Sequence, residues 1–337
     1  MSLRAAFRVV PAIALLCFVG CDVHDVVKPG TPTAPAASGA KKLRIAVIPK
    51  GTTHDFWKSV HAGAEDAAKE IGNIEIVWQG PADEKDKEAQ IKIIDSFVGE
   101  QIDGICMAPI DRDALIPAVK RAKAAGVPTV IFDSGLSDDS DVVSTVSTDN
   151  RNGGRIAGER LAEVMGGKGG VILLRYQAGS ESTENREEGF LEVIAKHPDI
   201  KVLSAEQRVD SDAQGALKIA ESLLREHHDS VNGVFTVCEP NNKGMLQALE
   251  NEKLAGKVKF VAFDSDPRMI EGLSRETVHG VVLQDPVRMG YLAVKTMAAH
   301  LKGETPEKKI STGEKLATPE NREQPEMKAL LAPKQYE

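Results

Sequence analysis

The feature that most constrains the fold is a regular alternation between short, β-branched apolar runs and longer stretches of helical periodicity. Strands that alternate with helices in this way build parallel sheets from βαβ units. In the first helical stretch, Trp57, Val60 and Ala64 begin an apolar stripe with i, i+3, i+4 spacing, which predicts a helix packed on a sheet. The runs expected to form strands are 43–48, 74–78, 104–108, 129–132, 170–174, 201–206, 233–237, 259–263 and 280–283.

The length of the chain favours two lobes over a single sheet. The chain has 337 residues, which exceeds the usual size of one domain. A polar interruption at 137–141, followed by a shorter apolar run at 142–146, is typical of a boundary between two units. We therefore predict an α/β protein with two similar Rossmann-like lobes built on parallel sheets. In such sheets, ligands bind beyond the carboxyl ends of the strands.

The composition argues against several classes of function. The net charge is -8, and Lys and Arg stand singly among Asp and Glu, so we expect no nucleic-acid partner. Cys106 and Cys238 end separate apolar runs and no C-x-x-C pair is present, which argues against a disulfide framework. The histidines are scattered without the spacing of metal ligands. We predict neither a metal site nor a cofactor.

The N-terminal region is expected to be a leader followed by a spacer. Two arginines precede an apolar run at 9–19, which is too short to span a bilayer and is typical of a secretory signal. The run ends at Cys21 in a stretch that resembles a bacterial lipoprotein box; the alternative is an ordinary signal peptide with an incidental cysteine. We predict that residues 1–21 are a lipoprotein signal peptide ending at a lipidated Cys21, and that 22–42 form a flexible linker rich in Pro and Ala. The protein would then be exported to the periplasm or the cell surface and anchored to the membrane.

Two adjacent aromatic residues follow the first expected strand. Phe56 and Trp57 come after a polar loop that contains His54. Adjacent helix residues point about a quarter turn or more apart, so both rings can hardly belong to the core. We interpret the pair as a stacking wall, because aromatic faces complement the C–H-rich faces of a sugar ring. For Trp57 alone, a place in the core is the alternative, since this residue begins the apolar stripe.

Two aspartates stand at matching strand ends. Asp133 follows Phe132, and Asp264 follows Phe263. An ionised carboxylate is an acceptor only, which suits the hydroxyl donors of a neutral polyol. The alternative is that each aspartate merely caps the next helix. Capping is the function that we expect of Asp111.

Further polar residues follow the strands of the second half. Arg186 could form a bidentate bond to a ligand or pair with a carboxylate, and the sequence favours neither. Gln284 offers both a donor and an acceptor. The remaining candidates for ligand binding are Glu184, Glu239 and Asn241.

Several stretches together match the pattern of one family. They are Phe56-Trp57 before a helix with Ala62-Gly63-Ala64, the strand end at Asp133, the stretch 147–154, the stretch 186–190 and Phe263-Asp264. From Leu43 to about Thr318 the chain thereby resembles the ribose-type family of periplasmic sugar-binding proteins, which deliver ligands to ABC importers.

The resemblance implies an organisation of the chain and a set of roles. The lobes would be joined by three crossings near Val146, Gln284 and Thr312, with the ligand between them. By the same resemblance, Phe56 and Trp57 stack on the sugar, and Asp133, Asp264 and Gln284 bind its hydroxyls. The implied boundaries are 43–146 plus 285–312 for the N-terminal lobe and 147–284 plus 313–330 for the C-terminal lobe.

Some positions depart from the ribose-binding pattern. Ser134 and Glu184 stand where the family has arginines, Ala108 and Cys238 where it has asparagines, and His54 near another usual asparagine. The loss of two arginines makes the site less cationic and richer in acceptors, which favours a neutral ligand over a sugar acid or phosphate. We expect a monosaccharide other than ribose, or a cyclitol.

The function expected from these features is that of the substrate-binding component of an ABC sugar importer, a monomer that delivers its ligand to a permease. The alternative is a receptor subunit that signals to a membrane kinase or a chemoreceptor, which the sequence does not distinguish. Paired carboxylates could serve glycoside cleavage, but no G-x-S-x-G or other catalytic motif supports an enzyme. A sugar-responsive repressor would need a basic helix-turn-helix ahead of Leu43, where a leader and spacer stand instead.

Overall fold

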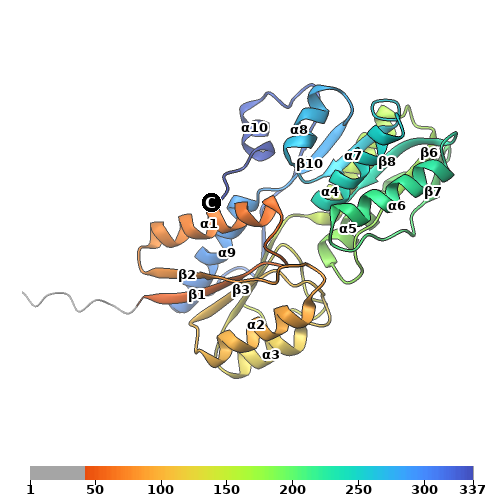
Figure 1. Ribbon diagram of the computed structural model, residues 1–337. Helices are drawn as coiled ribbons and strands as arrows, with labels where there is room; N and C mark the ends of the chain where they lie inside the picture. The colour runs from red at the N-terminus through yellow and green to blue at the C-terminus, as the bar shows by residue number, and fades with distance from the viewer. Residues whose placement is uncertain (1–41, 337) are drawn as a thin grey trace, which may run out of the picture. The chain divides into compact units, whose positions relative to one another are not determined.

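The computed structural model describes residues 42–336, which build two six-stranded sheets flanked by helices (Figure 1). The predicted signal peptide, Cys21 and residues 22–41 of the linker lie outside the described residues. The first sheet has the strand order β11-β5-β4-β3-β1-β2 and is parallel throughout. Its strands are β1 (Leu43–Ile48), β2 (Ile74–Trp78), β3 (Gly104–Met107), β4 (Thr129–Phe132), β5 (Ser144–Ser147) and β11 (Lys309–Ser311).

The second sheet repeats the same plan. Its order is β12-β10-β9-β8-β6-β7, and only the pair β10 and β12 is antiparallel. Its strands are β6 (Gly169–Leu174), β7 (Ile200–Ser204), β8 (Val231–Thr236), β9 (Lys259–Phe263), β10 (Gly280–Leu283) and β12 (Lys315–Ala317). The predicted fold class, two Rossmann-like α/β lobes, is therefore confirmed, and the expected strands form with bounds shifted by at most two residues.

Helices cover both faces of each sheet, which explains why the strands are apolar runs rather than alternating patterns. In β1, Ile45 and Val47 face one core while Ala46 and Ile48 face the other. The first sheet is covered by α1 (Asp55–Ile71), α2 (Lys87–Gly99), α3 (Ile116–Ala124) and α9 (Pro286–Leu301). The second is covered by α4 (Asn150–Val164), α5 (Glu181–Ile194), α6 (Ala213–Glu226), α7 (Glu239–Asn251) and α8 (Pro267–Ser274), while α10 (Pro325–Leu331) packs near β12.

Two helix pairs approach so closely that glycine is required at the contact. In the first lobe, a Cβ on Gly63 of α1 would lie 1.8 Å from the carbonyl oxygen of Val287. In the second, a Cβ on Gly154 of α4 would lie 2.1 Å from the carbonyl oxygen of Arg186 on α5. Both distances are far below van der Waals contact, so larger residues would push the helices apart. The second contact sets the position of the Arg186 backbone at the site described below.

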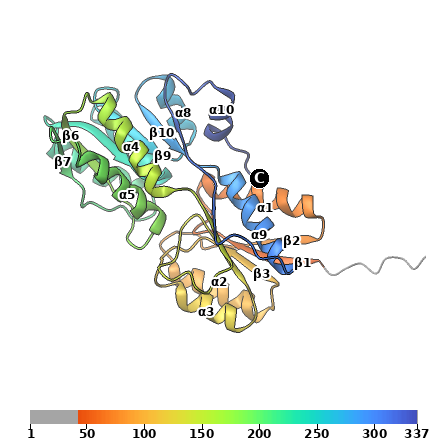
Figure 2. The same cartoon turned by 180° about the vertical axis from the view of Figure 1, so that it is seen from behind.

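The chain passes between the sheets after β5, after β10 and between β11 and β12 (Figure 2). Hydrogen bonds join the three passages: the hydroxyl of Thr148 donates to Oε1 of Gln284 at 2.7 Å and lies 3.3 Å from the hydroxyl of Thr312. A fourth connection was not expected from the sequence. After α10, residues 332–336 return to α1, where the Tyr336 N–H donates to the Lys58 carbonyl at 3.0 Å. We call residues 332–336 the C-terminal segment.

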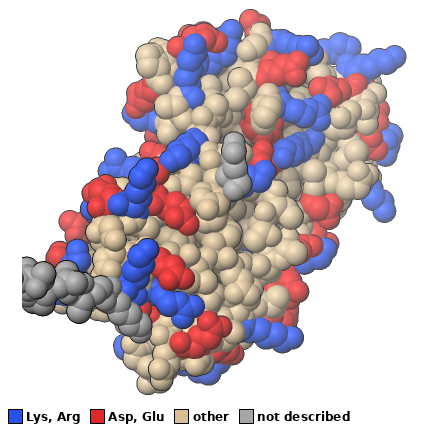
Figure 3. All heavy atoms as spheres, turned by 60° about the vertical axis from the view of Figure 1, so that its left-hand side comes forward, with Lys and Arg blue, Asp and Glu red and all other residues tan. Residues whose placement is uncertain are grey.

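Cys106 and Cys238 are both free and buried. Within residues 42–336, no helix combines the length and the apolar character that a membrane crossing requires. On the face shown in Figure 3, basic and acidic side chains are interspersed, as the sequence predicts.

Candidate functional site

A cavity lies where the carboxyl ends of the two sheets meet, and residues from both lobes form its wall. We call it the central cavity; its volume is about 370 Å³, including its opening. Among the residues predicted to bind ligand, the wall contains His54, Phe56, Trp57, Asp133, Arg186, Glu239, Asp264 and Gln284. Ser182 and Thr183, from the stretch that leads to Arg186, also belong to the wall, and the residues that the sequence analysis did not identify include Lys50, Glu84 and Tyr176.

The two strand-end aspartates share one backbone arrangement. Asp133 and Asp264 have φ values of 65° and 72°, in the left-handed region that Asp adopts more readily than most residues. The N–H of Asp133 donates to a carbonyl of β5 at 3.0 Å, and that of Asp264 to a carbonyl of β10 at 2.9 Å. Asn150 and Asn242 donate to the two aspartate carbonyls, at 3.4 and 3.1 Å. The carboxylates are therefore held at equivalent positions of the two lobes.

Asp133 pairs with a buried lysine. Nζ of Lys50, which follows β1, lies 2.9 Å from Oδ2 of Asp133. The same ammonium donates to the hydroxyls of Ser180 and Ser182 in the second lobe, at 3.2 Å each. All three ammonium hydrogens thus have partners, as a buried charge requires. The only sequence signal for Lys50 was its place in the polar loop that follows the first strand.

Asp264 pairs with Arg186 and Gln284. Nη1 of Arg186 lies 3.5 Å from Oδ2, and Nε2 of Gln284 donates to Oδ1 at 2.7 Å. Burial raises the pKa of Asp264 to about 6, and the Arg186 charge opposes this only in part. The sequence left two functions open for Arg186, a bond to a ligand and a pair with a carboxylate, and the structure shows the pair with Asp264.

The Arg186 side chain keeps one donor free of protein partners. Its Nε donates to Oδ1 of Asn150 at 2.8 Å, its Nη1 donates to the Val237 carbonyl at 2.9 Å, and its guanidinium lies 3.8 Å from the centre of the Phe263 ring. Arg186 is 2% exposed, and among the described residues Nη2 has no hydrogen-bond partner. Because buried donors are rarely left unpaired, Nη2 is suited to an acceptor on a ligand in the central cavity.

The two adjacent aromatic residues occupy different environments. Phe56 is half-buried, whereas Trp57 is 3% exposed and packs in the core below α1. Their rings meet edge to face, with centroids 4.8 Å apart and an interplanar angle of 85°. Both still contribute to the cavity wall, Phe56 from the side of solvent and Trp57 from the side of the core.

Glu84 connects both lobes beneath the central cavity. Its carboxylate accepts hydrogen bonds from Trp57 Nε1 at 2.7 Å and from the Tyr176 hydroxyl of the second lobe at 2.9 Å, and it lies 2.6 Å from His54 Nδ1. Burial would raise the pKa of Glu84, but the hydrogen bond and charge of His54 outweigh it and lower this pKa. For His54, burial alone would lower the pKa, and the bond to Glu84 raises it instead. The loop after β2 carried no motif that could have identified Glu84.

Three predicted residues, one of them in the cavity wall, have structural partners within the protein. The Glu239 carboxylate accepts the Phe56 N–H at 3.3 Å and so caps α1 from the opposite lobe. Glu184 pairs with Arg112 at 3.2 Å and is absent from the wall. Asn241 is fully buried and donates to the Leu174 carbonyl at 3.0 Å.

The positions that depart from the ribose-type pattern also have distinct surroundings. Ser134 is fully buried, and its hydroxyl accepts the N–H of Ser182 in the other lobe at 3.0 Å. The Ala108 carbonyl accepts a bond from Gln90 at 2.8 Å. Cys238 lines the central cavity, and burial raises the pKa of its thiol well above the ordinary value. Asp111 caps the turn before α3 by accepting the Ala114 N–H at 2.9 Å, as expected.

The central cavity is rich in acceptors. Four carboxylates line it, whereas lysine and arginine contribute one side chain each. A ligand with hydroxyl donors satisfies such a wall, while an anion would meet unfavourable charge. Among the described residues, no group of His, Cys, Asp or Glu side chains is placed to hold a metal ion.

Comparison with known proteins finds relatives along most of the chain. Residues 45–305 match the family model described as periplasmic binding protein domain. The ribose import binding protein RbsB of Escherichia coli is 30% identical over 283 residues, which cover 83% of this chain and 92% of that protein.

Solved structures show the same architecture. A carbohydrate transporter solute-binding protein of Agrobacterium radiobacter in complex with D-arabinose is 35% identical, with a TM-score of 0.82, covering 86% of this chain and 99% of that chain. An ABC transporter solute-binding protein of Agrobacterium vitis with bound D-fucose is 32% identical, with a TM-score of 0.83, covering 86% and 100%. The chain therefore belongs to the periplasmic binding protein family, among relatives of the ribose-binding type.

Proposed function

We propose that this protein is the substrate-binding component of an ABC sugar importer, and that it binds a neutral monosaccharide or polyol in the central cavity. The observation that carries the proposal is the pair of strand-end carboxylates, Asp133 and Asp264, which face one cavity from two lobes. Relatives described as sugar-binding proteins of such importers support it.

The ligand-binding set that we propose is narrower than the one expected from the sequence. Phe56 stacks on the ring, Asp133 and Asp264 accept hydroxyl hydrogens, and Nη2 of Arg186 and the Gln284 amide bind further oxygens. Trp57, His54 and Glu239 support this wall through the contacts described above. Glu184 and Asn241 do not belong to the proposed set, because they bond to Arg112 and to the Leu174 carbonyl.

The lobes that we propose as moving units have the boundaries 43–146 plus 285–312 and 147–284 plus 313–330. Ligand bonds to both lobes stabilise the closed arrangement, which is the form that a permease recognises. Lys50 bonds to Ser180 and Ser182 across the lobes support such a movement, because they exist only when the lobes are together.

A thermal-shift screen tests the proposed ligand class. The panel contains D-ribose, D-arabinose, D-fucose, D-allose, xylitol and myo-inositol, with ribose 5-phosphate and glucuronate as anionic controls. A bound ligand raises the melting temperature as the logarithm of its excess over the dissociation constant. We expect a shift from at least one neutral compound and none from the anions. A panel without any shift would refute the proposal.

Transport and sensing are distinguished in cells. Deletion of the gene should abolish uptake of the radiolabelled ligand; intact uptake with altered gene expression or movement would favour the receptor alternative.

Incubation with aryl glycosides of the bound sugar tests for hydrolysis, which we do not expect.

The periplasmic binding proteins that this chain resembles act outside the cytoplasm, and we propose export with lipid attachment at Cys21. Labelling of the full chain with radioactive palmitate, compared with the Cys21→Ser variant, tests the anchor. Equal labelling of the two chains would contradict it.

A further inference from the structure

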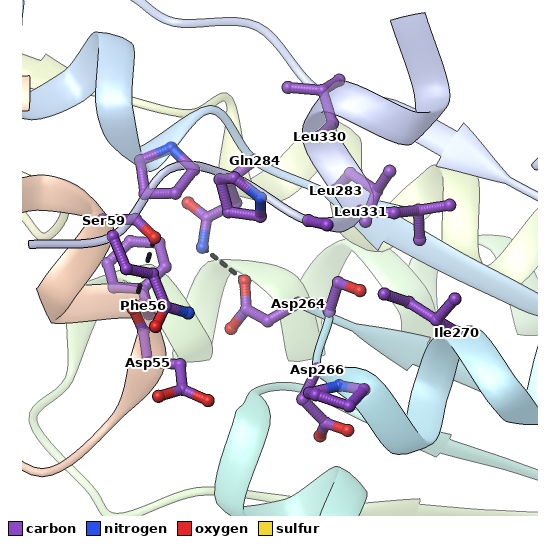
Figure 4. A pocket seen from close by; sticks show the side chains of 16 residues that line it. Asp55, Phe56, Ser59, Asp264, Asp266, Ile270, Leu283, Gln284, Leu330 and Leu331 are labelled. Atoms are coloured by element: carbon purple, nitrogen blue, oxygen red, sulfur yellow. Dashed lines mark hydrogen bonds between the residues drawn. The ribbon is translucent and has the colours of Figure 1, made fainter. Parts of the chain in front are cut away.

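A second cavity lies beside the central one and is larger. We call it the lateral cavity; its volume is about 640 Å³, including its opening. Four parts of the chain form its wall: the start of α1, the turn from β9 to α8, the end of β10, and the C-terminal segment with the end of α10 (Figure 4).

The lateral cavity adjoins the central cavity. Phe56, Asp264 and Gln284 belong to the walls of both. In Figure 4, the bonded pair Gln284 and Asp264 lies between Phe56 on one side and Ile270 and Leu330 on the other. A ligand bound to Asp264 in the central cavity is therefore next to the lateral one.

The C-terminal segment holds the outer wall in place. The Lys334 ammonium pairs with Asp66 of α1 at 2.6 Å. The Tyr336 ring packs at a tilt against the His61 ring, with centroids 3.9 Å apart, and the His61 ring stacks on that of Trp78, with centroids 4.2 Å apart. These contacts join the end of the second lobe to the first lobe, so the C-terminal segment is held in a defined position in the cavity wall.

The wall is acidic and apolar. Its charged side chains are Asp55, Asp264 and Asp266, and it contains no Lys or Arg among the described residues. Its apolar part includes Ile270, Leu283 and Leu330. A sugar ring presents the same two kinds of surface, hydroxyls at its edge and C–H groups on its faces, whereas an anion would be repelled.

Two buried polar atoms in this wall have no hydrogen-bond partner among the described residues. They are Oγ of Ser265 and Oδ2 of Asp266. Asp266 is 3% exposed, and its other oxygen caps α8 by accepting the N–H groups of Arg268 and Met269 at 2.7 and 3.1 Å. Buried polar atoms without partners are rare in native proteins and costly, so a ligand hydroxyl that reached either atom would be stabilising.

We propose that the lateral cavity is a second subsite, which holds the second, neutral ring of a two-ring glycoside whose first ring lies in the central cavity. The inference rests on the proposed sugar-binding function and extends its substrate class to disaccharides and comparable glycosides. Phe56, Asp264 and Gln284 belong to both walls, so the glycosidic link would lie beside these three side chains.

Titration calorimetry with defined probes tests the subsite. The monosaccharides of the screen are compared with maltose, cellobiose, lactose, melibiose and trehalose, and with the p-nitrophenyl glycosides of arabinose and fucose. We expect at least one two-ring probe to bind ten-fold or more tightly than its single-ring counterpart. In the Ile270→Trp variant, which fills the lateral cavity, this probe should lose ten-fold or more while monosaccharides change less than two-fold.

Two further chains serve as controls. Glu271→Trp places the same ring on the exposed face of α8 and should leave both ligand classes unchanged. A chain ending at Ala332 removes most of the C-terminal segment and should weaken only the two-ring probe, which keeps the test valid if Ile270→Trp does not fold.

The outcomes separate this inference from the proposed function. If monosaccharides bind but no two-ring probe binds more tightly, or if Ile270→Trp and the truncation leave its affinity unchanged, the subsite is refuted and the sugar-binding function stands. If neither class binds, both fail.

Discussion

Asp133 and Asp264 occupy equivalent positions in the two lobes, yet the cations that pair with them are held in place by different parts of the molecule. Both end a central strand in the left-handed region, with an asparagine on the carbonyl. The partner of Asp264 is Arg186, which is held by Asn150 and Val237 within its own half of the molecule. The partner of Asp133 is Lys50, whose remaining bonds cross to Ser180 and Ser182.

This difference indicates a division of labour between the lobes. The Arg186 pair is complete inside the second lobe, so it persists when the lobes separate. The Lys50 pair is complete only when the lobes are together, because water must replace the two serines on opening. The second lobe thus presents a preformed half-site, and the first lobe completes its half on closure.

The largest expected effect concerns stability. Arg186→Met leaves the Asp264 carboxylate buried without its cation, and breaking a buried pair in this way costs about 3 to 5 kcal/mol. Lys50→Met should cost less, because Asp133 becomes hydrated when the lobes separate. Urea unfolding followed by circular dichroism at pH 8 measures both. Equal losses would contradict the proposed difference, and Asp264→Asn added to Arg186→Met should restore part of the stability.

The second effect depends on pH. Burial raises the pKa of Asp264 from 3.8 to about 6, so the folded protein takes up a proton between these values. This proton uptake stabilises the folded protein at and below about pH 4, and the stabilisation is lost as the pH rises through 6. A difference of about two pKa units adds at most about 3 kcal/mol to the free energy of unfolding. Urea midpoints at pH 4.5 and 7.5 should differ less in Asp264→Asn than in the unmodified protein. An unchanged difference would show that other groups cause it.

The third effect concerns ligand affinity. Asp133→Ala and Asp264→Ala should each weaken binding of the sugar found in the screen by at least about 1 to 3 kcal/mol, because ligand hydroxyls lose their acceptor. Asp95→Ala, which removes an exposed ion pair with Arg121 and lines neither cavity, serves as the control. Calorimetry gives the affinities. Retained affinity in either variant would reduce that aspartate to a structural role.

The smallest effect is spectroscopic. Trp57 lies 6.4 Å from Phe132, next to Asp133, and its Nε1 bonds to Glu84. Sugar binding that completes the half-site at Asp133 should therefore shift the fluorescence of Trp57. The measurement uses Trp78→Phe, which leaves Trp57 as the sole tryptophan. An unchanged spectrum with a confirmed ligand would place Trp57 wholly in the core.

Much of the fold and part of the site could be predicted from the sequence. The strands and helices follow from apolar periodicity, which is a local property of the chain. The carboxyl ends of parallel strands meet at one edge, so polar residues there, such as Asp133, Asp264 and Gln284, could be identified as a site. Arg186 could be identified but not oriented, because its partners lie on three different elements.

The sequence by itself determined two α/β lobes and a carbohydrate-like set of strand-end residues. Only the tertiary structure decided how the charges are paired, since Lys50 and Ser180 are 130 residues apart and Glu84 and Tyr176 are 92 apart. It also decided that the C-terminal segment returns to α1 and closes a second cavity. Such contacts depend on how separate elements pack against one another, and no spacing along the chain encodes them.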